Sequence, residues 1–300
     1  MVEERGFGPL KIIPGSNNGY YPFCHSLYIE DSGVIIDPAS DRKRLLELRE
    51  KNGANEIWLS HWHEDHLMHL DLFDDLPLCI HQQDAPPLSD LEVFLDWHGL
   101  ERGKCDHQRE TWRRVMKANF NFCPRQPNRY LCDREVIELK NETVETIHTP
   151  GHSPGGLSFF FKESGILFLG DFDLTSFGPY YGDLYSSIDQ TIDSIRLLRS
   201  IPAKIWLTSH GAGIFENIPA KVWDNYLWVI QKREDNILDY LNQPRAIDEI
   251  INRWFIFGKR REYFPVEDLI LMERISIQKH MDRLIKQEFV SYCDGVYYLK

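Results

Sequence analysis

The stretch Ser60-His61-Trp62-His63-Glu64-Asp65-His66 carries more information about fold and chemistry than any other part of this 300-residue chain. It follows an apolar run at 56–60 that predicts a buried strand. In an extended backbone the side chains of His61 and His63 point to the same side, because side chains alternate with a period of two. Asp65 and His66 follow one turn later and can serve a second metal. Imidazole nitrogens and carboxylate oxygens suit zinc, iron or manganese.

Three later segments repeat this arrangement of an apolar strand followed by a residue that can bind a metal. Residues 151–156 carry His152 beside a turn, residues 166–171 end in Asp171, and residues 205–211 carry His210 before a glycine. Loops at strand ends are held by a rigid scaffold and remain open to substrate. The four segments together therefore predict one metal site at the edge of a sheet.

With these motifs, the chain resembles the metallo-β-lactamase-fold hydrolases over roughly residues 8 to 225. The resemblance implies an α/β protein, a four-layer αββα sandwich with two metals at one edge. It also implies that His61, His63 and His152 bind the first metal, that Asp65, His66 and His210 bind the second, and that Asp171 bridges both. The β-lactamases of this fold usually carry a cysteine in place of Asp171, so antibiotic hydrolysis is not expected.

The chemistry expected of such a site is hydrolysis by a metal-bridging hydroxide. A divalent metal lowers the pKa of bound water from about 15.7 to about 7, so no serine or cysteine nucleophile is required. Asp65 and Asp171 are the predicted catalytic residues, since they would bind the metals and orient the hydroxide. Two divalent metal ions are expected as cofactors. Zinc is the first expectation, with iron or manganese as alternatives, because His/Asp sites accept all three.

Composition limits the classes of protein that fit. The apolar fraction of 42% is enough for a core, and the six cysteines are scattered without a Cys-x-x-Cys pair. Free thiols, no apolar run long enough for a membrane span and no visible secretion signal predict a cytoplasmic protein without a membrane partner. The net charge of −12 argues against a broadly basic nucleic-acid-binding surface.

Two segments of the predicted catalytic domain, residues 1–243, are candidates for contact with substrate. Residues from about 88 to 130 read as a helical insert that either packs on the body or caps the metal site. The loop at 175–183 is rich in glycine and tyrosine. Tyr180 and Tyr181 there are predicted to bind substrate by donating to a developing oxyanion, with a structural role as the alternative.

The pattern changes after Gln243-Pro244, which predicts a second domain at 244–300. Helices are expected at 246–257, 265–273 and 276–287, followed by a hairpin with an Asp294-Gly295 turn. Three helices and a hairpin resemble a winged helix, which ends one branch of the metallo-β-lactamase-fold hydrolases, the branch that includes β-lactamase-like protein 2. The domain either has a structural or dimer-forming role or binds nucleic acid through its third helix.

Three classes of function remain for such a chain. The first is a dinuclear metal-dependent hydrolase, similar to glyoxalase II-like enzymes, that cleaves an ester, thioester or lactone of a small molecule. The second is a phosphodiesterase or single-stranded RNA endonuclease that uses the same metal site, because two metals suit in-line displacement at phosphorus. The third is a metal-binding redox or regulatory protein. A small-molecule substrate is the expected partner, and a homodimer or a nucleic acid are the alternatives.

Overall fold

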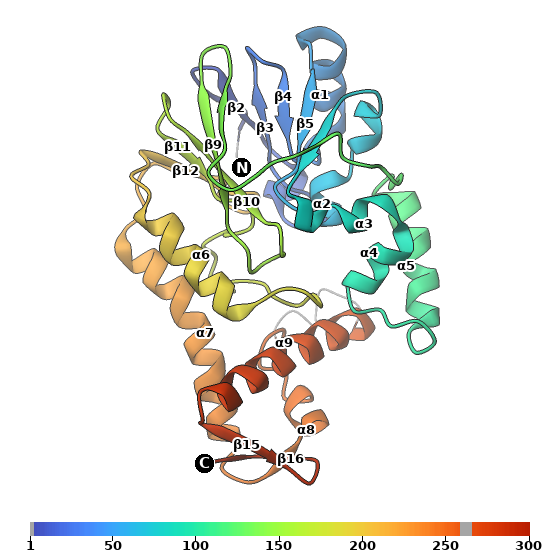
Figure 1. The fold of residues 1–300 in the computed structure, drawn as a ribbon, viewed down its shortest axis with the longest axis vertical. Helices are drawn as coiled ribbons and strands as arrows, with labels where there is room; N and C mark the ends of the chain where they lie inside the picture. The colour runs from blue at the N-terminus through green and yellow to red at the C-terminus, as the bar shows by residue number, and fades with distance from the viewer. Residues whose placement is uncertain (1–2, 259–265) are drawn as a thin grey trace.

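The computed structural model describes residues 3–258 and 266–300, and two sheets form the centre of the body (Figure 1). The first sheet contains seven strands in sequence order, antiparallel from β1 to β4 and parallel from β4 to β7. Its strands are β1 (Arg5–Phe7), β2 (Leu10–Ile13), β3 (Ser26–Ile29), β4 (Val34–Ile36), β5 (Glu56–Trp58), β6 (Leu78–Ile80) and β7 (Arg129–Tyr130).

The second sheet contains six strands in the order β13-β12-β11-β10-β9-β8. All neighbours are antiparallel except β11 and β12, which are parallel because the helix at 188–200 connects them. The strands are β8 (Val136–Glu138), β9 (Thr143–His148), β10 (Leu157–Phe161), β11 (Ile166–Phe168), β12 (Ile205–Leu207) and β13 (Ile214–Phe215).

The two sheets pack face to face through one apolar layer. Ile12, Leu27 and Trp58 of the first sheet lie in one cluster with Phe159 and Phe168 of the second. The rings of Trp58 and Phe159 stack with their centroids 5.6 Å apart. This contact between the inner faces is the core of a β-sandwich.

Helices cover both outer faces and complete four layers. Helix α1 (Arg42–Glu47) and the helical insert bury Ile35 and Ile57 on the outer face of the first sheet. Helices α6 (Ile188–Ser200) and α7 (Ala220–Tyr240) cover Leu167 on the outer face of the second. The predicted αββα sandwich is therefore confirmed.

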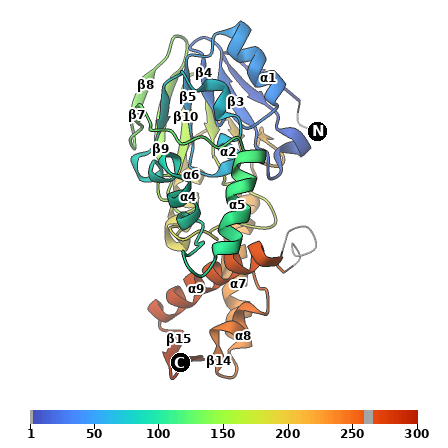
Figure 2. The ribbon, with the colours of Figure 1, turned by 90° about the vertical axis from the view of Figure 1, so that its right-hand side faces the viewer.

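The expected insert is helical and lies beside the first sheet, where Figure 2 shows α4 and α5 next to each other. It consists of α3 (Pro86–Ser89), α4 (Leu91–Trp97) and α5 (Asp106–Asn119). Arg109 of α5 is buried and joins the helices, since it donates to Asp96 of α4 at 2.6 Å and to the carbonyl of Leu100. The insert is thus a packed unit with an internal ion pair.

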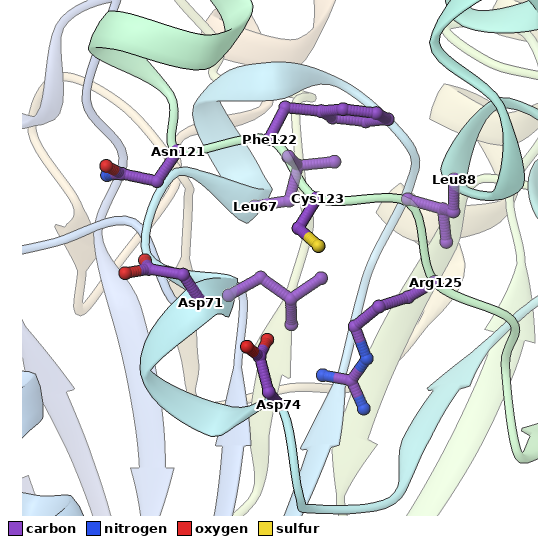
Figure 3. Close-up of a pocket in the computed structure, with 9 residues that line it drawn as sticks. Leu67, Asp71, Asp74, Leu88, Asn121, Phe122, Cys123 and Arg125 are labelled. Atoms are coloured by element: carbon purple, nitrogen blue, oxygen red, sulfur yellow. The ribbon is translucent and has the colours of Figure 1, made fainter.

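A small cavity lies between the end of the insert and the turn after helix α2 (Glu64–Leu67) (Figure 3). Leu67, Leu88 and Phe122 form its apolar wall, and Arg125 donates to the carbonyls of Phe73 and Leu76 beside it. Its volume of about 10 Å³ is at the lower limit for one water molecule. The cavity is therefore too small for a substrate.

The C-terminal segment packs around its own apolar cluster, to which the end of α7 contributes Ile237. It contains α8 (Ile247–Ile251), α9 (Val266–Lys286) and a three-stranded sheet of order β14-β16-β15. The strands are β14 (Arg245–Ala246), β15 (Val290–Cys293) and β16 (Val296–Leu299). The predicted hairpin is present, and Asp294 and Gly295 both have positive φ, as a type I′ turn requires.

The helices of this segment differ from the prediction. The helix expected at 246–257 is only α8, and those expected at 265–273 and 276–287 are one continuous helix, α9; residue 265 lies outside the described residues. Nothing between Glu273 and Ser276 breaks the helix, and the buried Glu273 accepts hydrogen bonds from the backbone N–H groups of Ile256 and Phe257. The winged-helix assignment and the boundary at 243 remain predictions.

Across the described ranges 3–258 and 266–300, none of the helices has the length and apolar character needed to cross a bilayer.

Candidate metal centre

Both sheets deliver side chains to one edge of the sandwich. Strand β5 ends at Trp58, and the chain then turns through His61 and His63 into α2, which carries Asp65 and His66. The second sheet contributes residues from the loops that follow its strands. The N–H of Leu157 donates to the carbonyl of Ser60 at 2.9 Å, so the start of β10 is joined directly to the histidine turn.

Four residues converge in the first group, which contains His61, His63, His152 and Asp171. The Nδ1 atom of His63 lies 2.9 Å from His61 Nε2 and 2.8 Å from His152 Nε2. The Oδ2 atom of Asp171 lies 3.2 Å from His152 Nε2. Three nitrogens and one carboxylate oxygen thus face a common point, an arrangement that suits a tetrahedral metal.

The second group contains Asp65, His66 and His210, and it shares Asp171 with the first. The Oδ1 atom of Asp171 lies 2.9 Å from His66 Nε2 and 3.3 Å from His210 Nε2. The Oδ2 atom of Asp65 lies 3.5 Å from His210 Nε2. Asp171 therefore presents one carboxylate oxygen to each group. All seven residues named from the sequence are brought together, and their role as ligands is taken up below as a proposal.

The ring nitrogens that face away from the two groups also have partners. His61 Nδ1 lies 2.9 Å from Ser60 Oγ, and His63 Nε2 lies 2.8 Å from Asp183 Oδ2. The remaining pairs are His66 Nδ1 with Asp37 Oδ2 at 2.9 Å, His210 Nδ1 with the carbonyl of Phe23 at 3.0 Å, and His152 Nδ1 with the carbonyl of Tyr180 at 3.4 Å. Such partners fix the tautomer and leave the other nitrogen free for a metal.

The inward atoms of the cluster fit a cation. His66 Nε2 and Asp171 Oδ1 are buried 2.9 Å apart, and neither makes a hydrogen bond of good geometry among the described residues. An unpaired buried polar atom is costly, and a divalent cation would satisfy both atoms at once. The donor set of imidazole and carboxylate groups also suits zinc, iron or manganese. The residues present therefore fit the metals that the motifs imply.

Electrostatics in the cluster follow from burial and close charges. Burial alone would raise the pKa of Asp171, but the nearby His66 and His210 imidazoles outweigh it and hold that pKa well below its usual value. Burial lowers the pKa of His61 well below its usual value, and the neighbouring His66 acts in the same direction. Burial opposes the charged forms of His66, His152 and His210, but the Asp171 carboxylate outweighs it and raises their pKa. The cluster thus favours a carboxylate anion at Asp171 and a neutral imidazole at His61, and metal binding would release protons from the other imidazoles.

The two tyrosines predicted to bind substrate occupy different environments. The ring of Tyr180 lies 5.5 Å from that of His152, and its hydroxyl donates to Asp183 at 3.3 Å. The Tyr181 hydroxyl contacts His280 Nε2 at 2.8 Å and accepts from Arg233 at 2.6 Å, so it points toward α9 and α7. The substrate-binding role of both remains a prediction, and in this arrangement only Tyr180 borders the histidine cluster.

Several residues of the site received no role from the sequence, among them Asp173, which lies in a further group of possible ligands with Asp171 and His210. The Asp37 carboxylate is hydrogen-bonded to His66, and the Asp183 carboxylate is hydrogen-bonded to His63. His98 of the insert contacts Asp183 Oδ1 at 2.9 Å through its Nδ1 atom. Asp37 had a detectable signal, because it is a polar residue directly after the apolar strand β4. Asp183 and His98 are 85 positions apart and meet only through the packing of the insert, so spacing could not identify them.

Known protein families and structures are similar to this chain. The family model described as the metallo-beta-lactamase superfamily matches residues 21–210. The chain is 24% identical over 154 residues to an atrochrysone carboxyl ACP thioesterase of Aspergillus fumigatus, which covers 51% of this chain and 35% of that protein. It is 27% identical over 173 residues to the "Probable metallo-hydrolase YqgX" of Bacillus subtilis, covering 54% and 68%. The chain spans about a third to a half of the first curated relatives it matches.

Solved structures share the fold over nearly the whole chain. A metallo-beta-lactamase family protein from Thermus thermophilus superposes with a TM-score of 0.72 at 19% identity, covering 97% of this chain and 99% of that one. A beta-lactamase domain protein from Burkholderia ambifaria gives a TM-score of 0.68 at 15% identity, covering 99% and 94%. The family match spans the histidine motif and the last predicted ligand, and the fold and cluster accord with it. The chain belongs to the metallo-beta-lactamase superfamily.

Proposed function

We propose that this chain is a dinuclear metal-dependent hydrolase that cleaves an ester, thioester or lactone of a small molecule. The observation that carries the proposal is the convergence of the seven predicted ligands into two groups that share the Asp171 carboxylate. His61, His63 and His152 would hold one metal. The other would be held by Asp65, His66 and His210, with Asp171 between the two.

In this proposal the protein contributes a rigid and partly dry site. When bound, two divalent cations supply a water of lowered pKa and a Lewis acid for the attacked oxygen. Asp65 and Asp171 would contribute the negative charge that holds the cations, and both are buried or nearly so. Because the ligand rings are fixed from behind by Ser60, Asp183 and Asp37, little reorganisation is needed during reaction. We propose zinc first, with iron or manganese as alternatives for elemental analysis to decide.

Thioesters are the first substrates to test. Two of the curated relatives from Aspergillus fumigatus bear the name of an acyl-carrier-protein thioesterase. The net charge of −12 also suits a small acyl substrate better than a polyanion. A thioester carbonyl is attacked by a hydroxide without help from a protein nucleophile, which fits a site built from metal ligands.

The alternative, cleavage of single-stranded RNA, lacks support from the C-terminal helix. Three residues of α9 that would read nucleic acid face the body, whereas Lys286 is exposed and pairs with Asp189. His280 is fully buried, Arg283 is paired with Glu234, and Lys279 donates to the carbonyl oxygens of the loop before α6. Nucleic-acid cleavage is therefore included in the test as the alternative outcome, although none of the contacts described above favours it.

The test compares substrates on metal-loaded protein. Purified protein would be incubated with a panel of acyl thioesters and lactones and, separately, with labelled single-stranded RNA. The Asp65→Ala variant is the control, with its fold checked by circular dichroism. We expect thioester or lactone cleavage that disappears in the control. Cleavage of RNA alone, lost in the same control, would replace the proposal with the nuclease; no turnover of any substrate by protein with both metals bound would reject the hydrolase.

A further inference from the structure

Residues 175–187, the second part of the loop between β11 and α6, lie between the candidate metal centre and helix α9. Its residue Asp183 is almost fully buried and uses both carboxylate oxygens. Oδ2 contacts His63 Nε2 at 2.8 Å, and Oδ1 contacts His98 Nδ1 at 2.9 Å. The carboxylate therefore joins a predicted metal ligand to the insert.

The insert holds this loop from one side. His98 caps the C-terminal end of α4, and its Nε2 atom lies 3.3 Å from the carboxylate of Glu64 in α2. The backbone N–H of Leu184 donates to the carbonyl of Trp97 at 3.0 Å. Both the side chain of Asp183 and the next peptide group are thus tied to the end of α4, which restricts how the carboxylate can move.

Helix α9 holds the same loop from the other side. The ammonium group of Lys279 donates to the carbonyl of Asp183 itself, to Ser186 Oγ at 2.6 Å and to the carbonyl of Tyr181 at 3.4 Å. All three donors of the ammonium are therefore committed to one loop. Burial of the ammonium group lowers the pKa of Lys279 to about 8.

Further side-chain contacts hold α9 against the rest of the protein. The adjacent His280 meets the Tyr181 hydroxyl at 2.8 Å, and Arg283 donates to Glu234 of α7 at 2.5 Å. At the other end of α9, Asp268 accepts from the indole N–H of Trp112 in the insert at 3.2 Å. Figure 1 shows α9 crossing below the body from α7 toward the insert. The helix therefore spans the two structures that enclose the loop.

We propose that Lys279 of α9 and His98 of the insert act through Asp183 as positioning residues for His63, which makes the C-terminal segment a working part of the metal centre. A carboxylate that accepts from His63 Nε2–H fixes the tautomer with Nδ1 free, and Nδ1 is the atom that faces His61 and His152. The inference rests on the proposed metal role of His63. It goes beyond that role because it assigns a function to α9.

The experiment measures metal binding rather than turnover. Competition with a chromophoric chelator gives the affinity for Zn²⁺, and the visible spectrum of the Co²⁺-loaded protein reports ligand geometry. Asp183→Asn, which keeps the shape of the side chain, should weaken binding of one metal equivalent by about 10–100-fold and alter the Co²⁺ spectrum. Lys279→Met should act in the same direction, and Lys279→Arg should restore part of the affinity.

Two controls separate positioning from general loss of stability. Lys286→Met removes another lysine of α9 whose side chain is 78% exposed, and it should leave affinity and spectrum unchanged. Melting temperatures of the metal-free proteins identify variants that fail to fold. If Asp183→Asn or Lys279→Met fails to fold, the same measurements are made on His98→Gln, and the nitrogen chemical shifts of His63 are measured in the wild type. Nitrogen shifts for His63 with the proton on Nδ1 would overturn the proposal.

Wild-type affinity and spectrum in Asp183→Asn would overturn this inference while leaving the proposed hydrolase intact. Weakened binding in Asp183→Asn and Lys279→Met, together with a wild type that binds two metals yet cleaves no substrate, would support the inference and reject the proposed function.

Discussion

The carboxylate of Asp37 meets Nδ1 of His66 at 2.9 Å, and both side chains are completely buried. The two residues are 29 positions apart, and they meet because β4 and β5 are parallel neighbours whose ends lie at the same edge of the sheet. The same carboxylate accepts from the N–H and the hydroxyl of Ser60, both at 2.7 Å. The buried Asp37 carboxylate therefore holds both Ser60 and His66, the first and last residues of the turn that carries the candidate ligands.

Replacement of this anion should weaken metal binding. In Asp37→Asn the side chain keeps its shape and loses the charge and one acceptor, so affinity at the second metal position should fall about 10–100-fold. The free energy of unfolding of the metal-free protein should fall by about 1–3 kcal/mol, because a buried hydrogen bond is lost. Chelator competition and urea unfolding measure the two effects. Asp31→Asn, an exposed aspartate, is the control, and equal affinity in both variants would contradict the prediction.

The shared carboxylate should matter more than any single histidine. Asp171→Asn removes the charge that lies within 3.2 Å of His152 and 2.9 Å of His66, so both metal positions are affected at once. We expect loss of at least one metal equivalent by elemental analysis and no measurable turnover. His210→Gln, a change at one position only, should spare one equivalent. Retention of two equivalents and full turnover by Asp171→Asn would overturn the bridging role.

The candidate ligands could be predicted because their positions are fixed by local pattern. Each follows a short apolar strand, and the ends of neighbouring strands meet at one edge of a sheet whatever the details of packing. The helix at 187–200 was predictable for a similar reason: Ser187 caps its first turn, and its apolar residues keep helical spacing.

The partners of the ligands could not be predicted in this way. Asp183 lies in a loop without periodicity, and its contact with His98 depends on how the insert packs against the body. The prediction of two helices at 265–273 and 276–287 was wrong, because nothing in the local geometry at Arg274 and Ile275 ends the helix. A side chain buried by tertiary contacts, such as Glu273, gives no signal in its own neighbourhood.

The insert should lose stability when its buried cation is removed. Arg109 has 1% of its side chain exposed and pairs with Glu92 and Asp96, which are about one-third exposed. In Arg109→Met the two carboxylates lose their partner while still reaching solvent, so a loss of about 2–3 kcal/mol is expected. Arg113→Met, which removes a more exposed partner of the same Glu92, should cost no more than about 1 kcal/mol. Thermal unfolding distinguishes the two, and equal losses would refute the assignment.

Acid should destabilise the metal-free protein partly through His25. Burial lowers the pKa of this histidine from 6.5 to about 4, and its Nδ1 atom accepts from the N–H of Gly15 at 3.0 Å. The unfolded chain binds this proton first as pH falls below 6.5, so folding stability should decrease between 6.5 and about 4. The contribution is at most about 3.4 kcal/mol. The His25→Asn variant should show a shallower loss over this range in denaturant titrations, and parallel curves would argue against it.

The ligand-bearing turns come from both halves of the sandwich, and this has a consequence for assembly. Residues up to β7 carry His61, His63, Asp65 and His66, whereas the second sheet and its loops carry the other three. Neither half alone contains all the residues of either group described above. In the proposed centre each metal would therefore act as a cross-link between two sheets that otherwise meet through apolar side chains. The free energy of metal binding would then be added to the association of the halves. Two fragments produced by a cut in the connection between β7 and β8 would reassemble more tightly with metal than without it.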